Sequence, residues 1–233
     1  MHDFTMPPEA IAAVTARLGR PHAVEALEPT RTALLVVDMQ NYFMAPGEPF
    51  ETPVARAVVP NVNALAGGVR RAGGTVVWIL NEAPRTPAEA WSSYRELHTP
   101  ERWAVRERAL AEGTRSHALW DALVSEPDDL HVTKIRFSAF IPGASDLDAR
   151  LRARGVDTLL VAGVATNICC ESTARDAMML NYRVVMLADA CAAPDDGAHA
   201  ASLINFYRFF GDVHDTPSIL AMLRAADAED AVA

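Results

Sequence analysis

The chain has 233 residues, with 21 lysine and arginine residues against 30 aspartate and glutamate residues, and a formal net charge of −9. Half of the residues are hydrophobic, which suits one globular α/β domain and excludes a disordered chain. The acidic balance argues against nucleic acid and anionic membrane surfaces as partners, because both bind proteins through basic side chains.

No membrane or export segment is predicted. The longest apolar runs, such as residues 158–164, are far shorter than the roughly 20 residues that a spanning helix needs. The first 21 residues lack the basic start, apolar core and cleavage site of a signal peptide, so we expect a cytoplasmic protein. The three cysteines, Cys169, Cys170 and Cys191, form neither a disulfide framework nor the paired spacing of a zinc site.

Short apolar segments alternate with helical patterns along most of the chain. Prolines surround a short helix, predicted over residues 9–18, in an N-terminal arm. Residues 32–38 form an apolar run that ends in an acid, which is typical of a strand buried on both faces of a parallel sheet. A helical pattern over residues 54–72 stops at Gly73-Gly74, and residues 75–80 predict a second strand.

Residues 81–129 are less regular and rich in Pro, Trp and Arg, with helical patches over 101–112 and 117–124; such an insertion often carries substrate contacts. The alternation then resumes. Strands are predicted over 131–137, 158–164, 183–188 and 212–214, and helices over 146–154, 167–181, 195–210 and 217–226.

This alternation predicts a three-layer α/β/α fold with a Rossmann-like topology around a central, mostly parallel sheet of about six strands. We expect an N-terminal arm over residues 1–30, a single domain over 31–226 and an acidic tail over 227–233.

Three polar residues fall where ligands of open parallel sheets bind, at the carboxyl ends of predicted strands. Asp38 ends the first strand, Lys134 lies in the third, and Cys169 begins the helix after the fourth, behind the loop GVATN. A helix N-terminus and a nearby lysine would each lower the pKa of the Cys169 thiol. A carboxylate in reach could take the thiol proton, so these residues predict a nucleophilic centre.

Each of these residues also has a purely structural interpretation. An acid at a strand end often caps a loop, and a cysteine in an apolar segment is usually inert packing, as we expect for Cys170 and Cys191. Lys134 is the single lysine of the chain. A GC-rich genome would replace lysine by arginine except where the larger guanidinium does not fit. His199 and His214 are expected to be surface or packing residues.

The sequence resembles the isochorismatase-like cysteine hydrolases in three strings: LLVVDMQNYF at 34–43, KIRFSAF at 134–140 and GVATNICCESTARDAMMLNY at 163–182. Their order and spacing hold over about residues 30–225, and the nearest group is that of the ureidoacrylate amidohydrolases. The resemblance implies an isochorismatase-like fold and a catalytic triad of Asp38, Lys134 and Cys169. The family commonly has valine after the nucleophile, where this chain has Cys170, but the spacing from GVATN favours Cys169.

The resemblance also implies a cis peptide before Ala165 and an oxyanion hole formed by the backbone NH groups of Ala165 and Cys169. In the implied reaction Asp38 takes the thiol proton, Cys169 attacks a carbonyl, Lys134 stabilises the charges, and water hydrolyses the thioester. Nicotinamidase-like members carry an Asp-x-His metal motif after the second strand, where this chain has Asn81-Glu82-Ala83. We therefore expect no metal and no other cofactor.

These features favour a cysteine hydrolase that cleaves a carbon–nitrogen bond in a small amide, ureide or lactam. Two other classes stay open: a vinyl ether hydrolase of the isochorismatase type, whose activity would survive Cys169→Ala, and a non-catalytic binding protein, which would have no reactive thiol. The family likeness and the apolar segment 203–213 predict a homo-oligomer, a dimer or a tetramer, although that segment could equally be core. The substrate pocket is expected to draw on neighbours of the motifs: Gln40, Asn41, Tyr42, Phe43, Asn81, Trp91, Phe137 and Phe140.

Overall fold

The computed structural model describes residues 1–230 and contains a six-stranded sheet in which all neighbouring strands are parallel. The strand order is β3-β2-β1-β4-β5-β6, which confirms the predicted α/β fold. The strands are β1 (Thr32–Val37), β2 (Thr75–Asn81), β3 (Leu130–Lys134), β4 (Thr158–Val164), β5 (Arg183–Ala192) and β6 (Asp212–His214).

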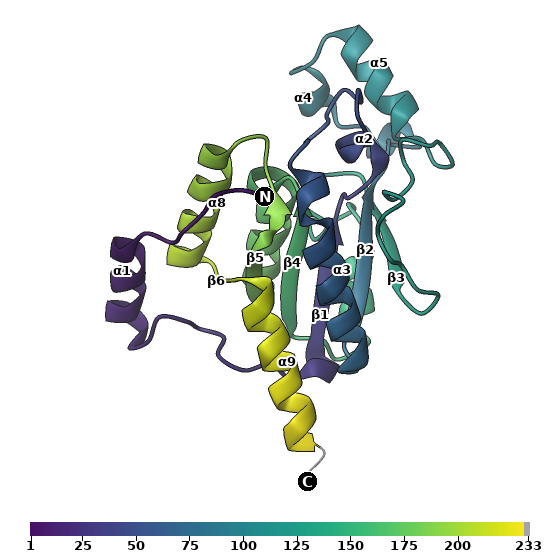
Figure 1. Ribbon diagram of the computed structural model, residues 1–233. Helices are drawn as coiled ribbons and strands as arrows, with labels where there is room; N and C mark the ends of the chain where they lie inside the picture. The colour runs from purple at the N-terminus through teal and green to yellow at the C-terminus, as the bar shows by residue number, and fades with distance from the viewer. Residues whose placement is uncertain (231–233) are drawn as a thin grey trace.

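Helices cover both faces of the sheet (Figure 1). Along β1, Leu34 and Val36 pack towards one face and Leu35 and Val37 towards the other, and every residue of this strand is buried. This burial explains the continuous apolar run in the sequence, because no position of the strand meets solvent. Helices α3 (Ala55–Arg71) and α9 (Thr216–Asp230) cover the first face, and α6 (Leu147–Arg152), α7 (Glu171–Met179) and α8 (Asp196–Phe209) cover the second.

The N-terminal arm folds back onto the same body. Its helix α1 (Pro8–Leu18) packs against α8 at the left of Figure 1. His22 of the arm hydrogen-bonds Asp212 of β6 at 2.9 Å, and the backbone NH of Val24 donates to the same carboxylate at 2.9 Å. Among residues 1–230 no helix is long and apolar enough to cross a membrane.

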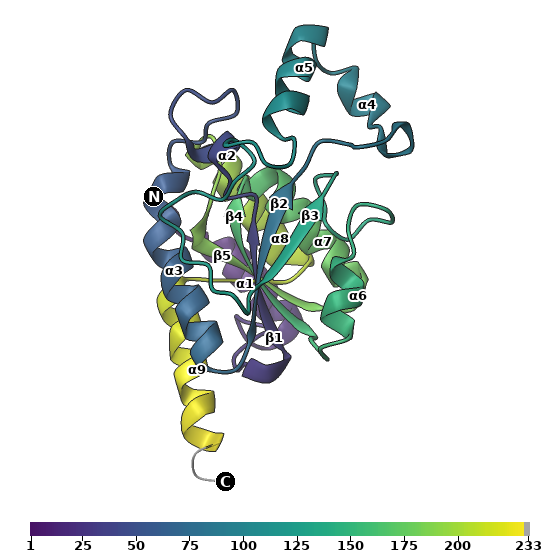
Figure 2. The same cartoon turned by 90° about the vertical axis from the view of Figure 1, so that its right-hand side faces the viewer.

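The insertion projects beyond the carboxyl end of the sheet, where α4 (Ser92–Arg95) and α5 (Pro100–Ala109) stand above α2 (Asn41–Met44) in Figure 2. The helix expected over residues 117–124 is wrong, because this segment forms turns and a single antiparallel bridge between Leu119 and Gln40. The Gln40 side chain donates to the carbonyl of His117, and the NH of Asn41 donates to that of Ala118. These carbonyls are therefore occupied by the β1–α2 loop.

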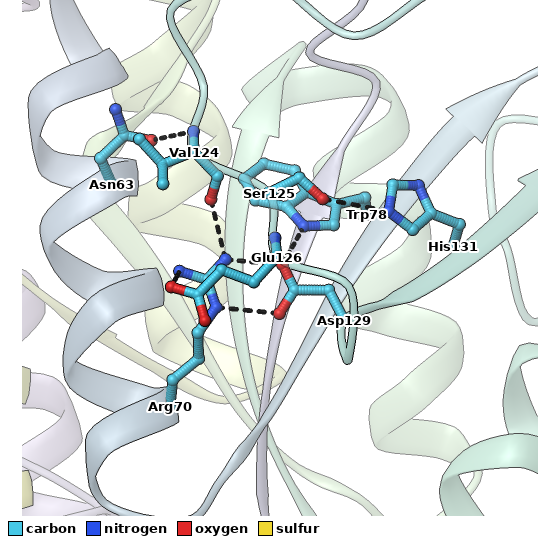
Figure 3. A network of polar contacts seen from close by, with 8 residues as sticks. All are labelled: Asn63, Arg70, Trp78, Val124, Ser125, Glu126, Asp129 and His131. Carbon is cyan, nitrogen blue, oxygen red and sulfur yellow. Dashed lines mark hydrogen bonds and ion pairs between the residues drawn. The ribbon is translucent and has the colours of Figure 1, made fainter.

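A polar network around Asp129 fixes the end of the insertion just before β3 (Figure 3). Asp129 accepts from the indole of Trp78 at 2.7 Å and from two nitrogens of Arg70 at 2.9 and 2.6 Å. Arg70 also donates to the carbonyl of Val124, whose NH donates to Asn63. Helix α3 and strand β2 thus hold the chain where it enters β3, the strand that ends at Lys134.

Three further differences concern the lengths of elements. Strand β5 continues to Ala192 rather than residue 188, and β3 ends at Lys134 rather than residue 137. Helix α9 continues to Asp230, so the first residues of the predicted acidic tail are helical, while residues 231–233 lie outside the described part. In the apolar segment 203–213, Leu203 and Phe206 are buried and Phe209 is exposed. Most of its hydrophobicity therefore serves the core, and oligomerisation stays a prediction.

Candidate active site

The carboxyl ends of β1 and β3 bring a carboxylate and an ammonium together. Lys134 Nζ donates to Asp38 Oδ2 at 2.7 Å and to the carbonyl of Arg136 at 3.0 Å, and both ionised side chains are fully buried. Since β2 lies between β1 and β3, the two strands are about two spacings, or roughly 10 Å, apart. The long lysine side chain spans this gap. Asp38 has a positive φ of 53°, which turns the chain out of β1 and costs about 1–2 kcal/mol.

Cys169 reaches the same place from the neighbouring strand β4. It lies in a short π-helical turn, η3 (Thr166–Cys170), between β4 and α7, and is 5% exposed. β1 and β4 are adjacent at the point where the strand order reverses, the usual ligand site of such sheets. Asp38 and Lys134 both lie close enough to the thiol to perturb its pKa. The peptide between Val164 and Ala165 is cis, as the resemblance implies.

A glycine allows β4 to approach β1 at this edge. Gly163 has a φ of +114°, and a Cβ atom there would lie 2.1 Å from the carbonyl oxygen of Val37. No side chain fits this position. The backbone of β4 therefore passes directly beside the residue that precedes Asp38, which places Cys169 near the carboxylate.

The pKa of Cys169 differs from our expectation. Burial, reinforced by the Asp38 charge, raises the pKa of the thiol above its usual value, and the opposing effect of Lys134 does not cancel this. Burial also raises the pKa of the Asp38 carboxyl, against the opposing charge of Lys134. Burial alone would lower the pKa of Lys134, but Asp38 and Cys169 together outweigh it and raise that pKa. The resting thiol is therefore protonated and needs a base.

Cys169 opens onto a cavity of about 200 Å³ beneath the insertion. Its wall is mostly apolar, with five aromatic side chains, a few polar groups and residues of the loop that follows β4. The lining residues are Tyr42, Phe43, Phe50, Glu51, Thr52, Asn81, Tyr94, Arg106, Phe137, Ala165, Ile168, Cys169 and Pro194.

Four of the eight residues in our predicted binding set, Tyr42, Phe43, Asn81 and Phe137, line this cavity. The other four are absent from the described lining. The side-chain amide of Gln40 hydrogen-bonds the backbone of Asn81: it donates to the carbonyl and accepts from the NH.

The remaining residues of that set also have other partners. Asn41 donates to backbone carbonyls of residues 115–119. Trp91 packs edge-on against Phe137, outside the cavity wall. Phe140 packs against Tyr182 in the core. Asn41 and Gln40 therefore hold the backbone around the cavity in place and do not line it.

Tyr94 and Arg106, from α4 and α5 of the insertion, also line the cavity and were not predicted from the sequence. The same holds for Phe50 and Pro194. No motif or periodicity marks these positions, because they reach the cavity through loops and short helices whose placement depends on the whole fold.

The two histidines expected to be surface or packing residues are both buried. His199 Nδ1 lies 2.9 Å from Thr166 Oγ1 in the turn that carries Cys169, and its ring stacks on His2 of the arm. Burial, reinforced by His2, lowers the pKa of His199 to about 4, so this ring is neutral at physiological pH.

Within the described residues, one group of metal-binding side chains converges, formed by His22, Asp212 and His214, outside the Cys169 cavity. The two imidazole rings are stacked 4.2 Å apart at 28°. Nearly parallel rings do not direct their lone pairs at one ion, and Asp212 already hydrogen-bonds His22 and the NH of Val24. This group fastens the arm to β6.

The chain is similar in sequence to one protein family and to a named relative. The model of the Isochorismatase domain matches residues 32–218. Ureidoacrylate amidohydrolase RutB of Methylobacterium radiotolerans is 36% identical over 219 residues, which cover 88% of this chain and 84% of that protein.

Two solved structures share the fold. A cysteine hydrolase from Pseudomonas syringae pv. phaseolicola is 29% identical with a TM-score of 0.80, over 90% of this chain and 100% of that one. N-carbamoylsarcosine amidase from Thermoplasma acidophilum is 28% identical with a TM-score of 0.64, over 80% and 96%. The chain thus belongs to the isochorismatase family of hydrolases.

Proposed function

We propose that this protein is a metal-independent cysteine hydrolase that cleaves a carbon–nitrogen bond in a small amide, ureide or lactam. One observation carries the proposal: a fully buried Asp38–Lys134 ion pair lies beside Cys169, which lines a small, mostly apolar cavity. A buried ion pair is expensive to maintain, and at a strand end beside a nucleophile it serves chemistry better than stability.

In the first half-reaction Asp38 accepts the thiol proton, and Cys169 Sγ forms a bond to the carbonyl carbon. The carbonyl π electrons move to oxygen, where the NH groups of Ala165 and Cys169 stabilise the negative charge. As the oxyanion collapses, the carbon–nitrogen bond breaks and the nitrogen leaves with the proton held by Asp38. The product is a thioester on Cys169 and a free amine or ammonia.

In the second half-reaction Asp38 takes a proton from water, and the hydroxide attacks the thioester carbonyl. Collapse of the second tetrahedral intermediate breaks the carbon–sulfur bond. The proton returns from Asp38 to Cys169, and the acid product leaves. Lys134 keeps its ammonium beside Asp38 and Cys169 throughout, so the negative charge that moves between the carboxylate and the thiolate stays neutralised.

The donor set does not fit a catalytic divalent cation. The ammonium of Lys134 lies beside Asp38, and the guanidinium of Arg106 lies in the cavity wall, so two cations occupy the region where an ion would have to bind. The names of two relatives support carbon–nitrogen cleavage, since one is an amidohydrolase and the other an amidase.

The test is a panel of small ureides, amides and lactams assayed for ammonia or amine release. We expect turnover that Cys169→Ala abolishes, whereas the adjacent Cys170→Ala, at a fully buried core position, keeps it. Activity that survives Cys169→Ala, on carbon–nitrogen bonds or on a vinyl ether, would overturn the nucleophile assignment. Absence of turnover together with an unreactive thiol would favour a binding protein.

A further inference from the structure

Arg106 is a buried cation in the wall of the Cys169 cavity. It lies on α5, is 4% exposed, and donates from Nη2 to Asn81 Oδ1 at 2.9 Å. Its other terminal nitrogen, Nη1, is buried and has no hydrogen-bond partner within residues 1–230. The guanidinium stacks over Trp103 and Tyr94, at 5.3 and 5.7 Å from the ring centroids.

A buried guanidinium normally has an anionic partner, because removing a charge from water is costly unless it is paired. The other deeply buried cation of this site follows that rule, since Lys134 pairs with Asp38. Arg70, at 15% side-chain exposure, pairs with Asp129. In the described part of the chain no carboxylate forms an ion pair with Arg106, and its neighbour Asn81 is neutral. The missing partner is an anion that arrives with the ligand.

A second unsatisfied donor lies in the same wall. The hydroxyl of Tyr42 is buried without a partner in the described residues, and burial raises the pKa of this phenol, so it keeps its proton. The carboxylate of Glu51, which also lines the cavity, does not compete for Arg106, because it pairs with Arg56 at 2.8 Å. Two buried donors without acceptors therefore belong to residues that line one small cavity.

We propose that Arg106 and Tyr42 form a carboxylate-binding subsite, so that the substrates of this enzyme are amides or ureides that also carry a carboxylate group. Guanidinium offers two parallel NH donors that match the two oxygens of a carboxylate, and the phenol adds a third donor. Phe43 and Phe137, which also line the cavity, suit the short carbon chain between the carboxylate and the scissile carbonyl. This inference rests on the proposed function and narrows its substrate class.

The experiment compares matched acids and amides: N-carbamoylglycine with N-carbamoylglycinamide, and N-carbamoyl-β-alanine with its amide. In the wild type kcat/KM should favour the acid of at least one pair. Arg106→Met should lower this acid-to-amide ratio by about 10- to 150-fold, the value of a hydrogen bond to a charged group, and Tyr42→Phe by about 2- to 10-fold. Arg108→Met, which removes an exposed cation from the same helix, should leave the ratio unchanged.

The ratio separates specificity from damage to the fold, since a destabilised variant loses both substrates equally. An equal loss of kcat/KM on the acid and on the amide in Arg106→Met would overturn the subsite. Arg106 would then serve to position Asn81. A wild type that prefers the amides would overturn it too.

A second readout does not need hydrolysis. Rates of Cys169 alkylation by anionic iodoacetate and neutral iodoacetamide should have a higher ratio in the wild type than in Arg106→Met. If no compound is hydrolysed but this ratio falls in Arg106→Met, the proposed function fails and the anion subsite stands. An unchanged ratio contradicts the subsite whatever the hydrolase assays show.

Discussion

The Asp38–Lys134 pair allows a quantitative prediction for the unfolding free energy, separate from activity. The variant Lys134→Met removes the only ion-pair partner that Asp38 has in the described chain and leaves a carboxylate at 0% exposure. At 2.7 Å and an effective dielectric constant of about 20, the lost attraction is about 6 kcal/mol. The stranded carboxylate can avoid part of this cost by taking a proton.

Protonation of Asp38 limits the loss of unfolding free energy in Lys134→Met. Bringing a carboxyl with an unfolded-state pKa of 3.8 into its neutral form at pH 7 costs about 4 kcal/mol, so Lys134→Met should destabilise the protein by no more than about 4 kcal/mol on account of this charge. At pH 5 the same limit is about 1.6 kcal/mol. The penalty is present above the unfolded-state pKa and disappears as the pH falls towards it, because the folded pKa is the higher one.

Urea unfolding followed by far-UV circular dichroism at pH 7 and pH 5 measures both values, in Lys134→Met, Asp38→Asn and the double variant. The double variant leaves no stranded charge, so its cost should fall short of the sum of the single costs by about 3 kcal/mol or more. Additive costs, or a Lys134→Met penalty as large at pH 5 as at pH 7, would refute the buried ion pair.

Three further predictions follow from the site and its supports. Gly163→Ala should destabilise the protein by several kcal/mol or abolish folding, because its Cβ would lie 2.1 Å from the Val37 carbonyl oxygen. Gly143→Ala has nothing within 4 Å of its Cβ and should cost only the strain of its positive φ. Thermal unfolding of the two variants measures this difference. The free energy of unfolding of the wild type should fall by up to about 3 kcal/mol as the pH drops from 6.5 to 4, because the unfolded chain binds a proton at His199 before the folded chain does. In urea titrations, His199→Gln should reduce this dependence on pH. The exposed control variant His131→Gln should not. Dialysis against a chelator should leave turnover unchanged, and loss of activity that zinc or manganese restores would contradict the metal-independent mechanism.

The sheet and the positions of Asp38, Lys134 and Cys169 at its carboxyl edge could be predicted from sequence because each leaves a local signature. β1 and β4 are buried at every position and therefore read as unbroken apolar runs. Asp38, Lys134 and Cys169 follow from one topological rule, the grouping of parallel strand ends, together with a resemblance that is confirmed at the level of the family. Their catalytic roles stay proposals.

The pKa of Cys169 and the cavity wall could not be predicted in the same way. A helix N-terminus and a lysine indicated a lowered thiol pKa, but burial and the Asp38 charge act in the opposite direction, and burial depends on the finished fold. Arg106 reaches the cavity from α5, whose position depends on packing between Trp103, Tyr94 and the rest of the insertion. No periodicity in the insertion encodes that arrangement.

The assignment of Cys169 as a nucleophile activated by Asp38 is tested by the rate of iodoacetamide labelling of each cysteine as a function of pH. Peptide mass spectrometry identifies the labelled cysteine. We predict that Cys169 is labelled well ahead of Cys170 and Cys191, which are fully buried. Asp38→Asn should change the rate of Cys169 labelling and its dependence on pH, because it removes both the proton acceptor and the charge that raises the pKa of the thiol. The surface variant Asp146→Asn should change neither. Equal labelling of the three thiols, or a Cys169 rate that Asp38→Asn leaves unchanged, would contradict a nucleophile activated by Asp38.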